Sequence, residues 1–397
     1  MFLLFFILLF LNSCIPETQK QTVYRLTPDS NSFIVEIHPS PRSLKTYFRI
    51  NPNESTVYEI LPGNKSFPYR YRVQPKSSLS DLVRTTSIDA DGFQIPGDAF
   101  LNCFGVNRTQ TQSIRIIWNV PEDWQIANSY GAGESSQDIV SSCKSLSASL
   151  FVGGRNLRIH RAPFGVLALQ GSFTQSDQNF SSAIDQNMRR VAEWWDEPLK
   201  PYHLAVMHAI ESETSEQEGG SAHLNAFQIR IIRDRALDSR FDALVTHEYF
   251  HQWNGLQINE PVYLDRQDAI DNRWFVEGLT EYFAHQISKN DFKPDPLEPN
   301  MPLAKLKYLF NTSNQFQTFP YRQGARIALI LEQWIQFYNP QNSLKTLMKE
   351  IIRRSRTDPD FTLTNPNIAR ALCESKLLEC LDADLFIQDF IFEGRSF

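Results

Sequence analysis

One short segment of the sequence carries a residue pattern that can hold a metal ion. It runs from Leu244 to Trp253, with His247 and His251 four residues apart and Glu248 directly after the first histidine. On a helix, residues four positions apart lie on one face, so both imidazoles can point at one ion. Glu248 then lies beside them, where its carboxylate can take a proton from a metal-activated water. This H-E-x-x-H pattern predicts a zinc site.

The pattern is rare by chance, and its neighbours suit a buried helix. With 8 histidines and 45 acidic residues in 397 positions, at most about 0.02 occurrences are expected in a random chain. The apolar residues Ala243–Val245 and Tyr249–Phe250 would bury such a helix. The alternative interpretation is two ordinary histidines on a partly buried helix.

A hydrolytic zinc site needs a third protein ligand and one open position. The longer pattern H-E-x-x-H-x-x-G-x-x-H is excluded, because Asn254 and Gln257 stand where it requires glycine and histidine. Downstream, Glu277 and Glu281 are four residues apart in the apolar run W-F-V-E-G-L-T-E-Y that starts at Trp274. They would share one face of a second helix, where one carboxylate can bind zinc and the other can accept a hydrogen bond from a ligating histidine. Their apolar neighbours argue against a merely solvated face.

The elements that must position these residues change character along the chain. From about residue 20 to 175, short alternating segments broken by Pro, Gly, Asn and Ser indicate a sandwich-like β domain. Examples of these predicted strands are Ser32–His38, Thr46–Ile50, Arg70–Val73 and Ser113–Trp118. Helical periodicity begins at Ser181–Trp195.

The second half of the chain mixes strands and helices. Strands are predicted at His203–Ile210 and His223–Ile232, and helices at Phe241–Asn254 and Arg273–Lys289. The Pro-rich stretch Lys293–Pro302 precedes a largely helical final third. We therefore expect an α+β multidomain fold, with a β domain at 15–175, a mixed domain at 176–292 and a helical domain at 293–397.

The two motifs together resemble the gluzincin metallopeptidases, and among them most closely the glycyl aminopeptidase family. H-E-x-x-H is followed by W-x-x-E-G-x-x-E-Y, with 25 residues between His251 and Glu277. The resemblance implies a β domain, a thermolysin-like catalytic domain and a helical domain. It also implies one zinc ion held by His247, His251 and Glu277, with Glu281 behind these ligands and Glu248 as the general base. The family's PDZ domain is not expected here, since the chain ends at Phe397.

A further motif, Tyr321-Arg322-Gln323-Gly324, is similar to the family's Y-x-K-G, with Gln323 in place of the lysine. The resemblance implies that Tyr321 donates a hydrogen bond to the oxyanion of the tetrahedral intermediate. Without the resemblance, Tyr321 is one of 13 tyrosines and has a packing role as its simplest interpretation.

The substrate-binding strand departs from the family pattern. Relatives carry G-G-L-E-H, whose glutamate is expected to hold the free amino group of the substrate, whereas this chain has Ala222 at that position. Gly219 and Gly220 are expected to let the backbone approach a bound peptide. Glu218 and Glu216 are near in sequence, but a shift to either would move the glycines. The resemblance thus implies a zinc-dependent metallopeptidase and leaves aminopeptidase or endopeptidase cleavage open.

Two other classes of protein remain as alternatives. The fold could serve an exported peptide-binding or metal-binding lipoprotein with little or no hydrolysis, and the altered glycine strand favours that interpretation. A purely structural envelope protein would require the zinc motif to be accidental. Peptide or protein is the expected partner. A nucleic-acid partner is not expected, because the net charge is −6 and no Lys/Arg block is present.

The N-terminus indicates export. Phe2–Leu11 is an uninterrupted apolar run, too short to span a bilayer and typical of a signal sequence. Leu11-Asn12-Ser13-Cys14 resembles a bacterial lipobox, so residues 1–14 are expected to be a signal segment with lipid attached to Cys14. An ordinary cleaved signal or a buried strand are the alternatives. We expect a location in the bacterial cell envelope, with a lipid anchor rather than a transmembrane helix.

Four cysteines remain if Cys14 is lipidated: Cys103, Cys143, Cys373 and Cys380. An even number in an exported chain is compatible with two disulfides, and four buried free thiols are the equal alternative. The chain has no C-x-x-C, which argues against a cysteine-based zinc or redox site.

Overall fold

The computed structural model describes residues 21–40, 56–75, 86–101, 109–211, 218–258, 272–290, 296–298, 301–305 and 314–395. The signal segment with Cys14, the strand predicted at Thr46–Ile50, Cys103 and Glu216 lie outside these ranges, so what we expect of them stays a prediction. Within the described ranges, no helix combines the length and apolarity needed to cross a bilayer.

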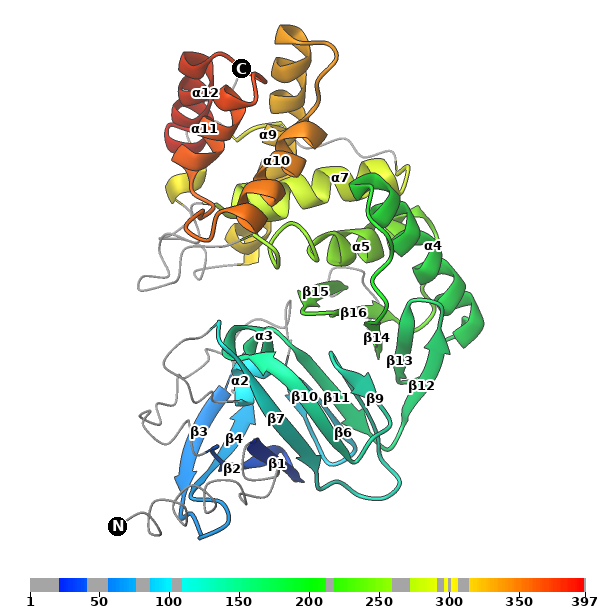
Figure 1. Ribbon diagram of the computed structural model, residues 1–397. Helices are drawn as coiled ribbons and strands as arrows, with labels where there is room; N and C mark the ends of the chain where they lie inside the picture. Colours follow the sequence, from blue (N-terminus) through cyan, green and yellow to red (C-terminus); the bar gives the residue numbers. More distant parts are fainter. Residues whose placement is uncertain are drawn as a thin grey trace, which may run out of the picture. The chain divides into compact units, whose positions relative to one another are not determined.

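The chain divides into two compact units, each built from more than one stretch of sequence (Figure 1). Unit 1 contains Met1–Ser172, Tyr202–Ile210 and His223–Gln228, and unit 2 contains Phe173–Pro201, Glu211–Ala222 and Ile229–Phe397. The expectation of a mixed fold with several sheets and helices is confirmed. The boundaries near residues 175 and 292 remain predictions.

Two sheets of unit 1 share one apolar core. Among the described residues, the first sheet has the strand order β10-β7-β1-β2-β4-β3 and the second β5-β6-β11-β8-β9. The first comprises β1 (Thr22–Asp29), β2 (Ser32–His38), β3 (Thr56–Leu61), β4 (Tyr69–Pro75), β7 (Thr111–Trp118) and β10 (Ser136–Ser142). The second comprises β5 (Ser87–Ile88), β6 (Gly92–Pro96), β8 (Gln125–Asn128), β9 (Gly131–Ala132) and β11 (Leu150–Gly154). Inward residues such as Phe33 of the first sheet and Phe93 of the second meet, with ring centroids 4.7 Å apart.

The alternation seen in the sequence produces these strands. β1 buries every second residue in its first half and pairs antiparallel with β2 through the turn at Ser30, whose φ is 56°. β1 also pairs in parallel with β7. Two short helices, α2 (Gly97–Phe100) and α3 (Cys143–Ser147), follow strands β6 and β10.

The third sheet contains the strand expected to line the substrate cleft. Its order is β12-β13-β14-β16-β15, formed by β12 (Leu157–Ala162), β13 (Gly165–Gln170), β14 (His203–Ile210), β15 (Gly219–His223) and β16 (Ala226–Ile232). The strand predicted at His203–Ile210 is present with those bounds. The single strand predicted at His223–Ile232 is wrong: it is split into the end of β15 and all of β16 by a turn. Asn225 has φ 50° there, a left-handed conformation that asparagine tolerates better than most residues.

The remaining elements are helices of unit 2. They are α4 (Asp177–Trp195), α5 (Ser239–Phe250), the π-helix η4 (Trp274–Gly278), α7 (Leu279–Ile287), the 3₁₀ turn η5 (Leu303–Lys305), α9 (Asn314–Tyr338), α10 (Leu344–Thr357), α11 (Asn365–Glu374), α12 (Cys380–Phe386) and the π-helix η6 (Ile387–Phe392). A disulfide joins Cys373 of α11 to Cys380 at the start of α12. The structure therefore favours the disulfide interpretation for this pair.

Candidate metal centre

Helix α5, which positions the H-E-x-x-H residues, has a side-chain cap at its N-terminus. The side chain of Asp238 caps it by accepting hydrogen bonds from the backbone N–H groups of Arg240 and Phe241 at 3.0 and 3.1 Å. Most of the helix is buried, so its histidines cannot swing into solvent. His247 and Glu248 are each 5% exposed, and His251, the residue after the helix, is 8% exposed.

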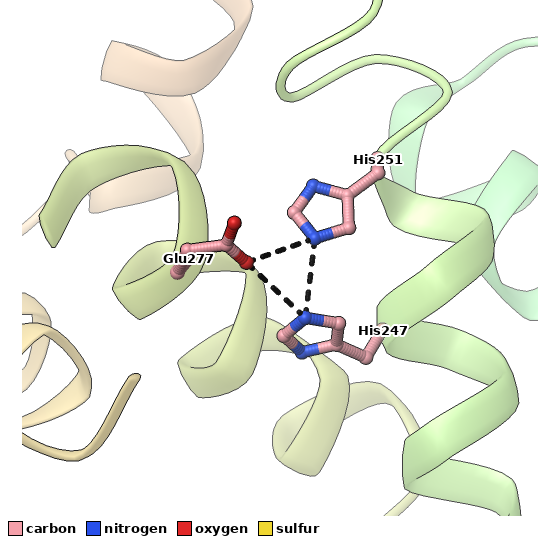
Figure 2. Close-up of side chains that lie close together, drawn as sticks. All are labelled: His247, His251 and Glu277. Atoms are coloured by element: carbon pink, nitrogen blue, oxygen red, sulfur yellow. Dashed lines mark hydrogen bonds and ion pairs between the residues drawn. The ribbon is translucent and has the colours of Figure 1, made fainter. Parts of the chain in front are cut away.

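Three side chains converge on one point (Figure 2). The Nε2 atoms of His247 and His251 are 3.1 Å apart, and Oε2 of Glu277 lies 3.6 and 3.2 Å from them, respectively. Zinc bonds of about 2.0–2.1 Å in a tetrahedral site would separate neighbouring ligand atoms by about 3.3 Å. The three atoms therefore have the spacing that a single zinc ion requires.

The oxygens behind the two histidines favour the ring tautomers that leave both Nε2 atoms as lone-pair donors to a metal. Nδ1 of His247 lies 2.8 Å from Oε2 of Glu281, and Nδ1 of His251 lies 2.8 Å from the backbone oxygen of Asn254. Because both oxygens can only act as acceptors, the nearby Nδ1 of each neutral ring is the nitrogen that carries the proton. When both rings are neutral, two imidazole lone pairs and a carboxylate oxygen face one another, a donor set that suits a cation.

Glu281 lies behind the ligating ring of His247. Its other oxygen, Oε1, lies 2.9 Å from Nε2 of His285, one turn further along α7. His285 was not singled out from the sequence, although its i+4 spacing from Glu281 was a usable signal.

Glu277 is presented by the π-helix η4 rather than by a regular α-helix. The next residue, Gly278, packs directly against Gly324 of α9: a Cβ built on Gly278 would lie 2.3 Å from the Cα of Gly324. Contact between two glycines lets the backbones of η4 and α9 approach more closely than any side chain would permit. The same contact brings α9, and with it Tyr321, to the ligand Glu277.

Glu248 is buried beside the three ligand atoms. Burial raises the pKa of its carboxyl group to about 7, while the neighbouring His247 and His251 act in the opposite direction. A carboxyl group with a pKa near neutrality can both accept and return a proton, as a general acid and base must. Gly220 of β15 lies against this carboxylate, since a Cβ there would be 2.6 Å from both Cγ and Oε1 of Glu248.

Replacement of Gly220 by alanine is expected to lower the cleavage rate at least about tenfold while zinc binding is retained. The added methyl must push the Glu248 side chain aside, and misplacement of a reacting group by about 1 Å can cost 100-fold. Steady-state cleavage of a peptide, together with zinc content, measures this effect. Ser221→Ala is the control, because successive residues of a strand point to opposite faces. Equal cleavage rates for wild type and Gly220→Ala would contradict this prediction.

Tyr321 lies over the site from α9. Its ring is nearly parallel to that of His247, with centroids 5.6 Å apart, and its hydroxyl hydrogen-bonds the Glu277 carboxylate. Burial and the negative charge of Glu277 raise the pKa of Tyr321 well above its usual value, so the hydroxyl stays protonated and able to donate. Gln323, which replaces the family's lysine, accepts from the backbone N–H of Glu298 and donates to the oxygen of Pro296, at 3.0 and 3.2 Å.

The acid directly before β15, Glu218, is engaged elsewhere. The carboxylate of Glu218 accepts a hydrogen bond from the backbone N–H of Ile232 at 3.2 Å and lies 3.5 Å from Arg235. It is therefore held by its own strand pair, and Ala222 carries no charge. Among the described residues of β15, no carboxylate replaces the expected glutamate.

Comparison with known proteins agrees with this site. Residues 240–348 match the model of the M61 glycyl aminopeptidase family. The resemblance seen in the sequence is thereby confirmed for the segment that carries both zinc motifs and Tyr321. No curated protein matches the chain in sequence.

Solved structures share the fold over nearly the whole chain. An aminopeptidase N family protein from Idiomarina loihiensis is 15% identical, with a TM-score of 0.68 over 95% of this chain and 76% of that one. A mutant M1 zinc metallopeptidase from Deinococcus radiodurans bound to a Tyr-Ser-Ala substrate is 12% identical, with a TM-score of 0.54 over 95% and 94% of the two chains. At these identities the likeness concerns the fold.

Proposed function

We propose that this zinc peptidase removes residues from the N-terminus of peptides and uses one zinc ion per chain. The observation that carries the proposal is the triangle of His247 Nε2, His251 Nε2 and Glu277 Oε2, with the buried carboxyl group of Glu248 beside it. The family match and the peptide bound to the Deinococcus radiodurans relative support a peptide substrate and N-terminal cleavage.

The residues around the three ligands divide the chemistry among them. Zinc, when bound, would supply a Lewis acid that polarises the scissile carbonyl and acidifies water. Glu248 takes the proton of the attacking water and later gives it to the leaving amine, for which its pKa of about 7 is suited. The Tyr321 hydroxyl donates a hydrogen bond to the oxyanion that develops on the carbonyl.

The substrate backbone has a matching partner in β15. This strand is the last in the order of its sheet and is therefore an edge strand among the described residues. An extended peptide can add to such an edge through main-chain hydrogen bonds. Gly220 brings that edge against Glu248, which aligns the peptide backbone with the general base.

The proposal is tested with zinc-loaded protein lacking residues 1–14 and a mixed peptide library, with products identified by mass spectrometry. Each peptide is supplied with a free and with an acetylated N-terminus. Loss of single residues from the free peptides alone is the expected result. Internal cuts in both sets would contradict N-terminal cleavage, although they would still demonstrate peptidase activity. Intact peptides in the presence of one bound zinc would instead favour the peptide-binding lipoprotein.

We propose in addition that the chain is exported to the bacterial cell envelope and anchored by lipid on Cys14, with a thermolysin-like catalytic domain at residues 176–292. The apolar run Phe2–Leu11 and the lipobox-like Leu11–Cys14 support the first part. The mass of the mature N-terminal peptide tests it: an unmodified Met1 would contradict export by this signal.

A further inference from the structure

A buried amide connects the two segments that supply the zinc ligands. Asn254 lies in the turn after α5 and is fully buried. Its Nδ2 atom lies 3.2 Å from the backbone oxygen of Phe275, 3.0 Å from that of Val276 and 3.0 Å from Oγ1 of Thr280. Since carbonyl oxygens only accept hydrogen bonds, the nitrogen of the amide must be the atom that faces them.

The acceptors belong to the π-helix that presents Glu277. Phe275 and Val276 are the two residues immediately before this ligand, and Thr280 is on the turn that follows. Backbone N–H groups of Phe275 and Val276 in turn bond to the oxygen of Asn272, at 2.9 and 3.1 Å. π-Helical turns are less favourable than α-helical ones and are retained where tertiary contacts support them. The amide of Asn254 is such a contact.

The backbone of the same residue holds the other side of the site. Its oxygen accepts the hydrogen bond from Nδ1 of His251, at 2.8 Å, and its N–H donates to the oxygen of Phe250, at 3.1 Å. Asn254 therefore contacts His251 through its main chain and the Glu277 segment through its side chain. A displacement of either segment relative to the other would break one of these bonds.

We propose that Asn254 is a positioning residue that fixes the distance between His251 and Glu277 and so prepares the site for zinc. A hydrophobic or smaller residue would remove the side-chain donor from two buried carbonyl oxygens of the ligand helix, and the oxygen of Phe275 would keep only the backbone N–H of Leu279. Loss of a hydrogen-bonding partner behind metal ligands typically weakens metal binding 10- to 100-fold. The proposal deepens the proposed function and rests on its zinc site.

The test compares zinc affinity in two variants, Asn254→Ala and Asn254→Leu. Both remove the donor, and the leucine keeps most of the volume, so that a cavity alone cannot explain a shared effect. Asn187→Ala and Asn187→Leu are matched controls. Asn187 of α4 is also fully buried and donates from Nδ2 to the backbone oxygen of Ala183 at 2.9 Å and to Asp242 in the first turn of α5 at 2.7 Å, so it contacts the same helix away from its ligand end. Zinc dissociation constants are measured by competition with a chelator on protein whose fold is verified by circular dichroism.

We expect the Asn254 variants to bind zinc about 10- to 100-fold more weakly than wild type, and the Asn187 variants within about twofold of it. The rise in Tm produced by added zinc should shrink in the Asn254 variants alone. Wild-type affinity in a folded Asn254 variant, or an equal loss in the Asn187 controls, would overturn the positioning role. Absence of zinc binding by the wild type would instead contradict the proposed zinc site itself.

Discussion

Glu248→Gln is expected to abolish peptide cleavage while zinc affinity is retained. The amide has the same shape as the carboxyl group and would keep its place against Gly220, but it can neither take a proton from water nor return one to the leaving amine. General acid–base groups contribute about 100- to 10,000-fold to rate, and one residue here performs both transfers. We therefore expect a loss of at least about 1,000-fold in kcat, measured by single-turnover cleavage with zinc content determined in parallel.

Two comparisons make this result specific. Glu193→Gln removes one negative charge from the exposed face of α4 and should leave kcat unchanged. The Glu248→Gln protein should still be stabilised by zinc, because none of the three ligand atoms is altered. A kcat within tenfold of wild type would rule out Glu248 as the proton-transfer residue.

Gly324→Ala should both destabilise the protein and remove most of its activity. The added Cβ would lie 2.7 Å from the backbone oxygen of Trp274 and 2.8 Å from the Cα of Gly278, atoms that cannot rotate away. The helices η4 and α9 must then separate. Overpacking of this kind costs about 1–3 kcal/mol, and displacement of Glu277 and Tyr321 by about 1 Å would cost roughly 100-fold in rate.

The sign of the change in the free energy of unfolding distinguishes the close contact from the effect of helix propensity. Helix propensity alone would make alanine more stable than glycine by about 1 kcal/mol, so a lower free energy of unfolding can only come from the close contact. The free energy of unfolding is measured by denaturant unfolding of wild type, Gly324→Ala and Gln333→Ala. Gln333 is an exposed position of the same helix and serves as the control. A stabilised Gly324→Ala protein would show that η4 and α9 are not in backbone contact.

Much of the candidate site could be predicted from local sequence. His247 and His251, and likewise Glu277 and Glu281, are each four residues apart, and helical geometry alone puts such pairs on one face. That the two faces meet did not follow from spacing, since His251 directly follows α5 whereas Glu277 lies on the separate helix η4. The family resemblance supplied that step, and the structure brings their ligand atoms to 3.2 Å.

The strands were predictable where the sequence alternates, as in β2, or forms a short apolar run, as in β14. Ser32–His38 and His203–Ile210 have the predicted bounds. The hairpin of β15 and β16 was missed because the polar residues of His223–Ile232, Asn225 among them, are single residues between apolar ones and resemble the alternation of one continuous strand. Its turn depends on a single left-handed residue, which a pattern of hydrophobicity does not register.

Contacts between distant backbone segments could not be predicted. Gly220 was expected to approach a substrate, yet the structure places it against Glu248. In the sequence Asn254 is recognisable only as a mismatch to another zinc motif, although its buried amide connects both ligand segments. The π-helical form of η4 likewise depends on tertiary contacts, because its residues have ordinary helical spacing in the sequence.

The pair Gly278 and Gly324 also constrains how the protein can change over time. In most packed pairs of residues, a larger side chain on one member can be offset by a smaller one on the other, and related sequences then vary at both positions together. Glycine has no side chain that could be shortened. A larger residue at either position therefore cannot be offset by a smaller residue at the other. Among related sequences that keep this site, we expect both positions to be invariant rather than correlated, and a search for covarying pairs would overlook the contact.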